Sequence, residues 1–150
     1  MMEVSLDIYA NGDEETSFIT GGYATWGGGI LIQENATCIM YGVNLFENKS
    51  SANTSNAGGA GIYVRATLKM YDGCLISQYS EVNGSGIYID STGKAEISRT
   101  RLINNRSGLE TKKGGAIFSY GSLTIENATF MNNESGNLGG RFVLILPNKI

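Results

Sequence analysis

The segment GGAIFSYGSLTIENATFMNN (114–133) contains the pattern that decides the fold. It opens with two glycines before Ile117, continues with the apolar-x-apolar triplet LTI, and ends with the tetrapeptide FMNN. Apolar and polar residues alternate in runs of a few residues, and Gly, Asn and Ser separate these runs. Such a pattern is typical of short β-strands joined by tight turns.

The same pattern recurs through the chain, and its copies align in one register. Glycine-led segments run into apolar pairs at GGGILI (27–32), GAGIYV (59–64), GSGIYI (84–89), GGAIFS (114–119) and GGRFVL (139–144). Between consecutive copies lies a gap-free block, at CIMYGVNLFEN (38–48), LKMYDGCLISQ (68–78), AEISRTRLINN (95–105) and LTIENATFMNN (123–133). The repeats are short, and apolar and polar residues alternate at every second position within them. This combination predicts an all-β parallel β-helix (solenoid) of about five rungs, each of three short strands.

The register also predicts which side chains face the inside of the solenoid. We name the three predicted strands of a rung the first, second and third walls, in the order glycine-led segment, apolar-x-apolar pair and Leu/Phe position. The expected inward residues are Ile30, Ile32, Ile62, Val64, Ile87, Ile89, Ile117 and Ser119 on the first wall, Cys38, Met40, Leu68, Met70, Ala95, Ile97, Leu123 and Ile125 on the second, and Leu45, Leu75, Leu102 and Phe130 on the third. Stacked in columns, these residues would bury a core that no single rung could bury.

The repeats predict one β-helix domain, 1–150, whose ends are incomplete. It would contain a partial first rung with an acidic loop (1–26), four repeats (27–138) and an incomplete last rung (139–150). No amphipathic capping helix is visible, which favours a fragment without end caps or a truncated chain.

The partial first rung follows from the same register. Leu6 and Ile8 would lie on the second wall, joined to the third wall through an acidic loop, 11–15. We expect Phe18 on the third wall, because its distance along the chain from Ile30 equals that from Phe130 to Phe142 in the last rung.

The spacing between walls alternates along the chain. The first wall leads to the second through the intervals Ile30 to Cys38, Ile62 to Leu68, Ile87 to Ala95 and Ile117 to Leu123, in which a longer interval alternates with a shorter one. This alternation predicts that the repeating unit is a pair of rungs. The third wall leads to the next rung through intervals that alternate in the same way: Leu45 to Ile62, Leu75 to Ile87, Leu102 to Ile117 and Phe130 to Phe142. The surplus residues of the longer intervals lie in two polar loops, 49–58 and 106–114, which would project from the same edge.

Composition excludes several functional classes. The chain has 21 Gly, one Pro and no His, and its net charge is −3. Without His there are no Ser–His or Cys–His nucleophile pairs and no His-dependent zinc catalysis, so no cofactor, metal site or catalytic residue is expected. The negative charge argues against a nucleic-acid partner, and the lack of a long apolar run argues against membrane insertion by this chain. Cys38 and Cys74 would face opposite ways and remain unbridged.

A column of amide side chains would form where each third-wall strand ends. Its members are Asn48, Gln78, Asn105 and Asn133. Their spacing favours a structural ladder in which each amide hydrogen-bonds its neighbour along the stack. Three of them also begin Asn-x-Ser motifs, so glycosylation or ligand binding is the alternative. Asn53, in a long loop, begins the motif that we expect to be most accessible.

An aromatic and apolar stripe is predicted on the outer face of the first wall. Its residues alternate with the inward ones: Leu31, Tyr63, Tyr88, Phe118 and Val143, with Trp26 extending or capping the stripe. A continuous exposed stripe would be a binding surface. The alternative is stacking between rungs beneath a loop, which needs no ligand.

The tetrapeptides GGAI (114–117) and FMNN (130–133) resemble the polymorphic outer membrane protein repeat, whose hallmarks are GGA[ILV] and FxxN. Near copies are GGGI (27–30), GAGI (59–62), GSGI (84–87), LFEN (45–48) and LINN (102–105). The family comprises chlamydial-type autotransporter adhesins. The resemblance implies a right-handed parallel β-helix, a location at the cell surface or outside the cell as part of a longer protein, and a role in adhesion.

Three functions are compatible with these observations. The first is a non-enzymatic adhesin-like module that binds a host-cell protein or glycan through the outer stripe or the long loops. The second is a structural spacer that associates end to end with itself, which the apolar run FVLIL (142–146) favours. The third is a polysaccharide-degrading β-helix, which is disfavoured because Asp72, Asp90, Glu96 and Glu126 share no column.

Overall fold

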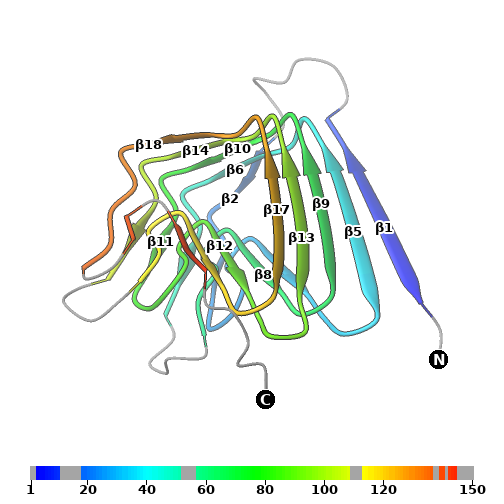
Figure 1. The fold of residues 1–150 in the computed structure, drawn as a ribbon, viewed down its shortest axis with the longest axis horizontal. Coiled ribbons are helices and arrows are strands. Elements are labelled where there is room, and N and C mark those ends of the chain that lie inside the picture. Colours follow the sequence, from blue (N-terminus) through cyan, green and yellow to red (C-terminus); the bar gives the residue numbers. More distant parts are fainter. Residues whose placement is uncertain are drawn as a thin grey trace.

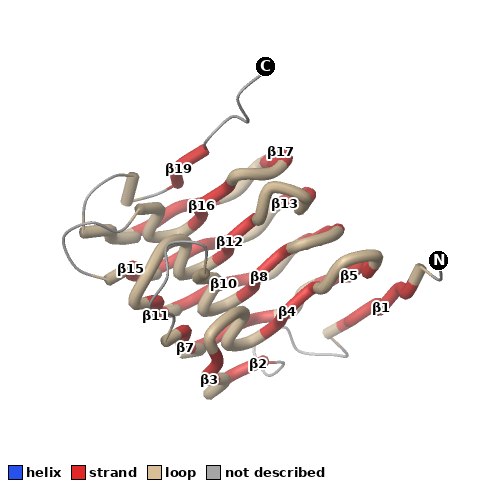
Figure 2. Tube along the Cα trace, turned by 90° about the horizontal axis from the view of Figure 1, so that it is seen from below, coloured by secondary structure: helices blue, strands red, loops and turns tan. Residues whose placement is uncertain are grey.

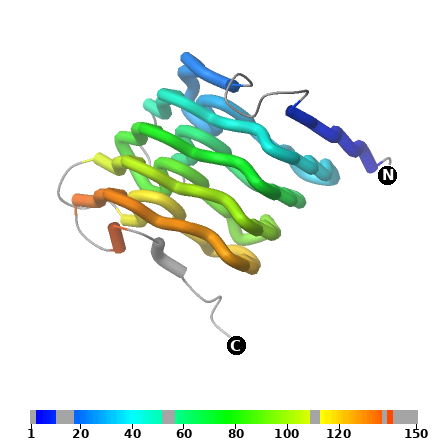
Figure 3. The backbone as a smooth tube through the Cα atoms, turned by 90° about the horizontal axis from the view of Figure 1, so that it is seen from above, coloured from blue at the N-terminus to red at the C-terminus, as the bar shows by residue number. Residues whose placement is uncertain are grey.

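The protein is a right-handed parallel β-helix, as the repeats and the family resemblance predict. The computed structural model describes residues 3–10, 18–51, 57–108, 113–136, 139–140 and 142–144. Within these residues the regular elements are all β-strands, and the strands pair in parallel in four sheets. Figure 1 shows the strands of successive rungs lying side by side, and Figure 3 shows the rungs stacking in chain order.

Three of the sheets are the predicted walls. The first-wall sheet contains β4 (Ile30–Ile32), β8 (Ile62–Val64), β12 (Ile87–Ile89), β16 (Ile117–Ser119) and β19 (Phe142–Leu144). The second-wall sheet contains β1 (Val4–Tyr9), β5 (Ala36–Tyr41), β9 (Thr67–Tyr71), β13 (Lys94–Ser98) and β17 (Ser122–Glu126). The third-wall sheet contains β2 (Phe18–Thr20), β6 (Asn44–Phe46), β10 (Cys74–Ile76), β14 (Arg101–Ile103) and β18 (Thr129–Met131).

A fourth wall completes each of the first four rungs, and the sequence pattern did not predict it. It consists of the two-residue strands β3 (Tyr23–Ala24), β7 (Lys49–Ser50), β11 (Tyr79–Ser80) and β15 (Arg106–Ser107), which form a row in Figure 2. Its buried positions are serines rather than aliphatic residues, and the hydroxyl groups of Ser50 and Ser80 lie 3.3 Å apart. Hydrophobic periodicity cannot detect strands so short and so polar.

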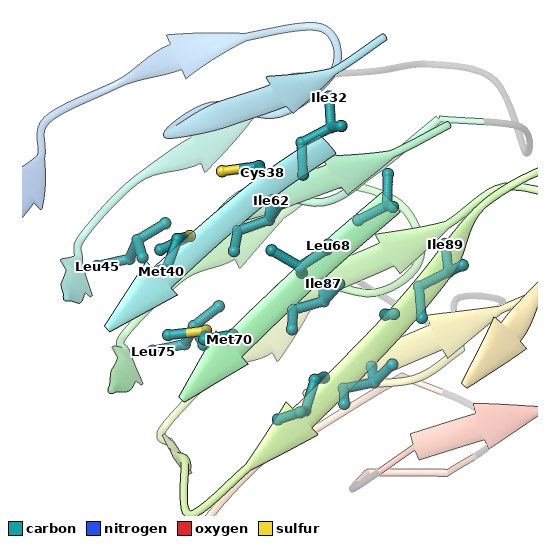
Figure 4. Packing of buried hydrophobic residues seen from close by; sticks show 14 of the residues in the cluster. Ile32, Cys38, Met40, Leu45, Ile62, Leu68, Met70, Leu75, Ile87 and Ile89 are labelled. Atoms are coloured by element: carbon teal, nitrogen blue, oxygen red, sulfur yellow. The ribbon is translucent and has the colours of Figure 1, made fainter. Parts of the chain in front are cut away.

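The predicted inward residues form the core (Figure 4). Met40, Leu68, Met70, Leu45 and Leu75 are fully buried. The end rung contributes residues that pack against this core and stay partly exposed: Leu123, Ile125 and Phe130. The columns predicted from the repeat are therefore confirmed on all three walls.

The first rung matches the prediction on the second wall and differs from it on the third. Strand β1 pairs with β5 so that Leu6 and Ile8 fall in the predicted inward register. On the third wall, Ile19 lies opposite Leu45 and packs against the core, whereas Phe18 is 49% exposed. The prediction for Phe18 is wrong by one position, because the connection from the third wall to the next first-wall strand is shorter here than in the last rung.

Some predicted features lie outside the described residues. They are the acidic loop 11–15, Asn53, the central parts of the loops 49–58 and 106–114, the side chain of Val143 and the end of the FVLIL segment.

Candidate functional site

The aromatic stripe of the first wall is a buried ladder. Tyr63, Tyr88 and Phe118 are each only 1% exposed, so the prediction that they form an exposed surface is wrong. Their rings stack along the solenoid with centroids 4.9 and 5.4 Å apart, and Tyr120 packs edge-on against Phe118 at 4.9 Å. The alternative, stacking between rungs beneath other segments, is confirmed. We call Tyr63, Tyr88 and Phe118 the buried aromatic ladder.

The glycine-led turns pack closely against residues of this ladder. Gly59, Gly84 and Gly114 have φ angles between 58° and 66°, the left-handed region that glycine adopts without strain. A Cβ atom on Gly84 would lie 2.6 Å from the Ile87 carbonyl oxygen and 2.9 Å from the Phe118 Cβ. A Cβ on Gly58 would likewise lie 3.0 Å from Cδ2 of the Tyr88 ring, so the repeated glycines let the backbone approach the ladder residues closely.

The N-terminal end of the stripe differs, because Trp26 and Leu31 remain 39% and 37% exposed. The Trp26 ring contacts Tyr63 at a centroid distance of 6.3 Å. The Arg65 guanidinium carbon lies 5.1 Å from the Trp26 centroid and 5.4 Å from the Tyr63 centroid, a cation–π arrangement with both rings. Among the described side chains of the predicted stripe, only this end offers aromatic surface to a ligand.

The Asp90 carboxylate binds the polar groups of Tyr63 and Arg65 at this end of the ladder. Asp90 accepts a hydrogen bond from the Tyr63 hydroxyl at 3.1 Å, and its Oδ2 lies 3.5 Å from Arg65 Nε. Burial, followed by the negative charge of Asp90, raises the pKa of Tyr63 to about 12. Burial likewise raises the pKa of Tyr88. Both phenols thus stay neutral over the physiological range.

The predicted amide ladder is present and continuous. Asn48 Nδ2 donates to Gln78 Oε1 at 3.0 Å, the Gln78 backbone N–H donates to Asn105 Oδ1 at 3.1 Å, and Asn105 Nδ2 donates to Asn133 Oδ1 at 2.9 Å. Each amide nitrogen also donates to a carbonyl of the preceding rung, as Asn133 does to Leu102 at 2.8 Å. These bonds satisfy polar groups inside the solenoid, so the ladder is structural.

The same geometry explains why Asn-x-Ser motifs recur. The side chains of Asn48 and Asn105 are fully buried, and Ser50 and Ser107, two positions further on, are buried in the fourth wall. An inward amide followed two positions later by an inward serine creates the motif. Neither Asn48 nor Asn105 can carry a glycan in the folded protein, because its amide group is already used in the ladder.

A second aromatic ladder lies on the outer face of the second wall, and it was not predicted from the sequence. Tyr9, Tyr41 and Tyr71 stack with centroids 5.1 and 5.0 Å apart, and the first two are 62% and 40% exposed. We call these three residues the tyrosine row. The signal was present in the repeat, because LDIY (6–9), CIMY (38–41) and LKMY (68–71) carry Tyr at the same position.

Charged pairs border the tyrosine row. The Tyr71 hydroxyl donates to Glu96 Oε1 at 2.9 Å, beside the two-bond pair of Arg99 with Asp72 at 2.7 and 2.8 Å. Hydrogen bonding from Arg99 lowers the pKa of Asp72. The second wall therefore presents exposed aromatic edges, phenol hydroxyls and fixed charges of both signs on one surface.

Possible metal ligands and the two cysteines are distributed as follows in the described part of the chain. No group of three or more acidic or cysteine side chains converges there on a possible metal position. Cys38 and Cys74 are unbridged, as predicted, and Cys74 is buried like Cys38 although it faces the other way. Burial, followed by the charge of Asp7, raises the pKa of Cys38. None of the described segments is a helix with the length and apolar character needed to cross a membrane.

Comparisons with protein-family models, with curated proteins and with solved structures found no match to this chain.

Proposed function

We propose that the chain is a non-enzymatic, adhesin-like β-helix module that binds a host-cell protein or glycan through the outer face of its second wall. The proposal places it at the cell surface or outside the cell, as part of a longer protein. That location rests on the resemblance of GGAI and FMNN to the repeats of surface adhesins.

The tyrosine row is the observation that carries this proposal. Tyrosine is enriched at protein interfaces because it offers a large, stiff, amphipathic contact surface at a low cost in conformational entropy. Tyr9 and Tyr41 hold their rings in fixed positions while leaving edges and hydroxyl groups exposed. The strands beneath are paired into a five-stranded sheet, so the surface is preorganised before a partner arrives.

The experiment is a binding assay on cultured host cells with the double variant Tyr41→Ser, Tyr71→Ser. We expect binding to be lost while the circular dichroism spectrum stays unchanged, because both side chains lie outside the core. The matched control is Tyr23→Ser, which removes an exposed tyrosine (70%) from the fourth wall. Retained binding by the double variant, or equal loss in the control, would contradict the proposal.

A second candidate function is a spacer that associates with another copy of itself. Strands β1 and β2 are edge strands of their sheets, and Val4, Leu6 and Phe18 on them are 53%, 58% and 49% exposed. Open strand edges with apolar side chains favour pairing with a further strand. Sedimentation velocity over a hundredfold range of concentration tests this candidate: growth of a larger species supports it, and a single monomeric species rejects it.

A further inference from the structure

The alternating spacing between the first and second walls has a consequence in the folded protein. The turn after β4 contains three residues (33–35), the turn after β8 contains two (65–66), and the turn after β12 contains four (90–93). Both longer turns are closed by hydrogen bonds, Ala36 N to Gln33 O at 3.2 Å and Gly93 N to Asp90 O at 2.9 Å. The short turn therefore projects less far from the solenoid than the turns of the two neighbouring rungs, which leaves a notch between those turns.

This notch is an open pocket on the edge of the solenoid. It has a volume of about 360 Å³ and is lined by Glu34, Asn35, Arg65, Ala66, Thr67, Thr92 and Lys94. The exposed side chains of Glu34 and Asn35 come from one long turn and that of Thr92 from the other, while Ala66 packs against the core. A cavity of this size accommodates a small ligand.

The polar groups of the notch are of mixed type. Arg65, Lys94 and Asn35 supply N–H donors, and Glu34, Asn35, Thr67 and Thr92 supply oxygen acceptors. A cation site would not contain two basic side chains, and a site for a simple anion would not contain the Glu34 carboxylate. Sugar hydroxyl groups both donate and accept hydrogen bonds, so a polyhydroxy ligand matches the set.

Two of the lining groups are held in place before any ligand binds. Arg65 lies against the rings of Trp26 and Tyr63 and pairs with Asp90. Thr92 Oγ1 donates to the Arg65 carbonyl at 2.8 Å, which ties the long turn to the short one. Binding would therefore cost little ordering of these groups.

We propose that this notch is a binding site for a single neutral sugar unit, either free or within a glycan. Glu34 and Asn35 would bind hydroxyl groups from one side, Thr92 and Lys94 from the other, and Arg65 from the end next to Trp26. The site is separate from the tyrosine row, and the proposal stands whether or not that row binds a partner.

The test is an NMR titration of the full chain with glucose, galactose, mannose and N-acetylglucosamine, each up to about 50 mM, since one sugar unit in a shallow site binds on the order of millimolar. Glucuronate and inorganic phosphate are titrated in parallel. We expect at least one neutral sugar to give saturable shifts at the backbone amides of Asn35, Ala66 and Thr92. Saturation with glucuronate or phosphate alone, or no saturable shift with a neutral sugar, would overturn the proposal.

A matched pair of variants locates the site. Asn35 and Asn127 are both exposed and both left-handed, with φ of 62° and 53°, so replacement by Gly removes the amide without straining the backbone. Asn35→Gly should weaken sugar binding about tenfold, and Asn127→Gly should leave it unchanged. Equal affinities in the two variants would reject the notch as the site.

A third variant separates this proposal from the proposed function. The double variant Tyr41→Ser, Tyr71→Ser should lose cell binding and keep the sugar-dependent shifts. Loss of the shifts in this variant would show that the sugar binds at the tyrosine row, and would overturn the assignment to the notch.

Discussion

The two aromatic ladders of this solenoid are built alike and end in opposite environments. In the buried ladder, Tyr63 and Tyr88 stack at 4.9 Å; in the tyrosine row, Tyr9 and Tyr41 stack at 5.1 Å. The first pair is 1% exposed at each residue, and the second is 62% and 40% exposed. Stacking follows from the rung spacing alone, whereas exposure depends on which segment lies over the wall. An aromatic column is therefore a structural result of this fold, and only an uncovered one is a candidate binding surface.

The two ladders should differ most in the stability that the protein loses when one ring is removed. Tyr88→Ala should lower the free energy of unfolding by about 4 kcal/mol, because it leaves a cavity between Tyr63 and Phe118. Tyr41→Ala, which removes an exposed ring with two stacked neighbours, should cost under about 1 kcal/mol. Urea denaturation of both variants measures the two changes in the free energy of unfolding. Equal changes would show that the buried aromatic ladder and the tyrosine row contribute equally to stability.

The cover of the buried ladder can be disturbed without touching a ring. Gly84→Ala should cost about 3 kcal/mol, from a left-handed φ that a Cβ disfavours and from a Cβ placed against Phe118. The control is Gly21→Ala, where φ is 73° and no atom lies within 4 Å of the new Cβ, so only the backbone strain remains. Thermal unfolding of the pair should show the larger loss for Gly84→Ala. If both variants lose the same stability, the close approach to Phe118 is unimportant.

The buried ladder should also make the protein sensitive to high pH. An unfolded tyrosine loses its proton near pH 10.0, whereas folded Tyr63 keeps it until about pH 12. Between these values the unfolded chain releases a proton that the folded protein holds, so stability present below pH 10 is lost as the pH rises through 12. The difference between the folded and unfolded pKa of Tyr63 corresponds to about 3 kcal/mol.

The variant Tyr63→Phe isolates that contribution, because phenylalanine does not ionise. Denaturation at pH 9 and pH 12 should show a smaller loss of stability in the variant than in the parent protein. Parallel losses would mean that Tyr63 ionises alike in the folded and unfolded states.

The smallest change in stability is expected from substitutions in the tyrosine row. The double variant Tyr41→Ser, Tyr71→Ser should change the free energy of unfolding by no more than about 1 kcal/mol, since only exposed stacking and one hydroxyl contact are lost. Urea denaturation measures it alongside the cell-binding assay. A loss above about 3 kcal/mol would place the tyrosine row among the elements that hold the fold together.

Prediction from sequence succeeded where the information was local and repeated. The inward columns follow from strict alternation, as in Leu68 and Met70, and the amide ladder follows from Asn or Gln at one position of each repeat. Exposure of outward residues is different, because it depends on segments that the repeat does not place. The turn at Gly84, which belongs to the preceding rung, packs against the Cβ of Phe118, and the local sequence pattern around Phe118 contains no sign of that contact.

Chain spacing also contained more information than the predictions drew from it. The alternation of long and short intervals indicated a repeat of paired rungs. The resulting notch could be found only from the structure, because it depends on how far neighbouring turns project from the solenoid. The serine-lined fourth wall was missed for another reason, because its very short strands have too few positions to show a period.

The amide ladder and the alternating turns together restrict how a gene encoding this protein can change in length. Each ladder amide bonds only to backbone groups and to the next amide, so any rung can follow any other. Unequal recombination that adds one rung would preserve the ladder but place two turns of equal height side by side. Gain or loss of two rungs, the interval from Ile30 to Ile87, preserves both features. Natural length variants should therefore differ in two-rung steps, and each added step would bring one more notch.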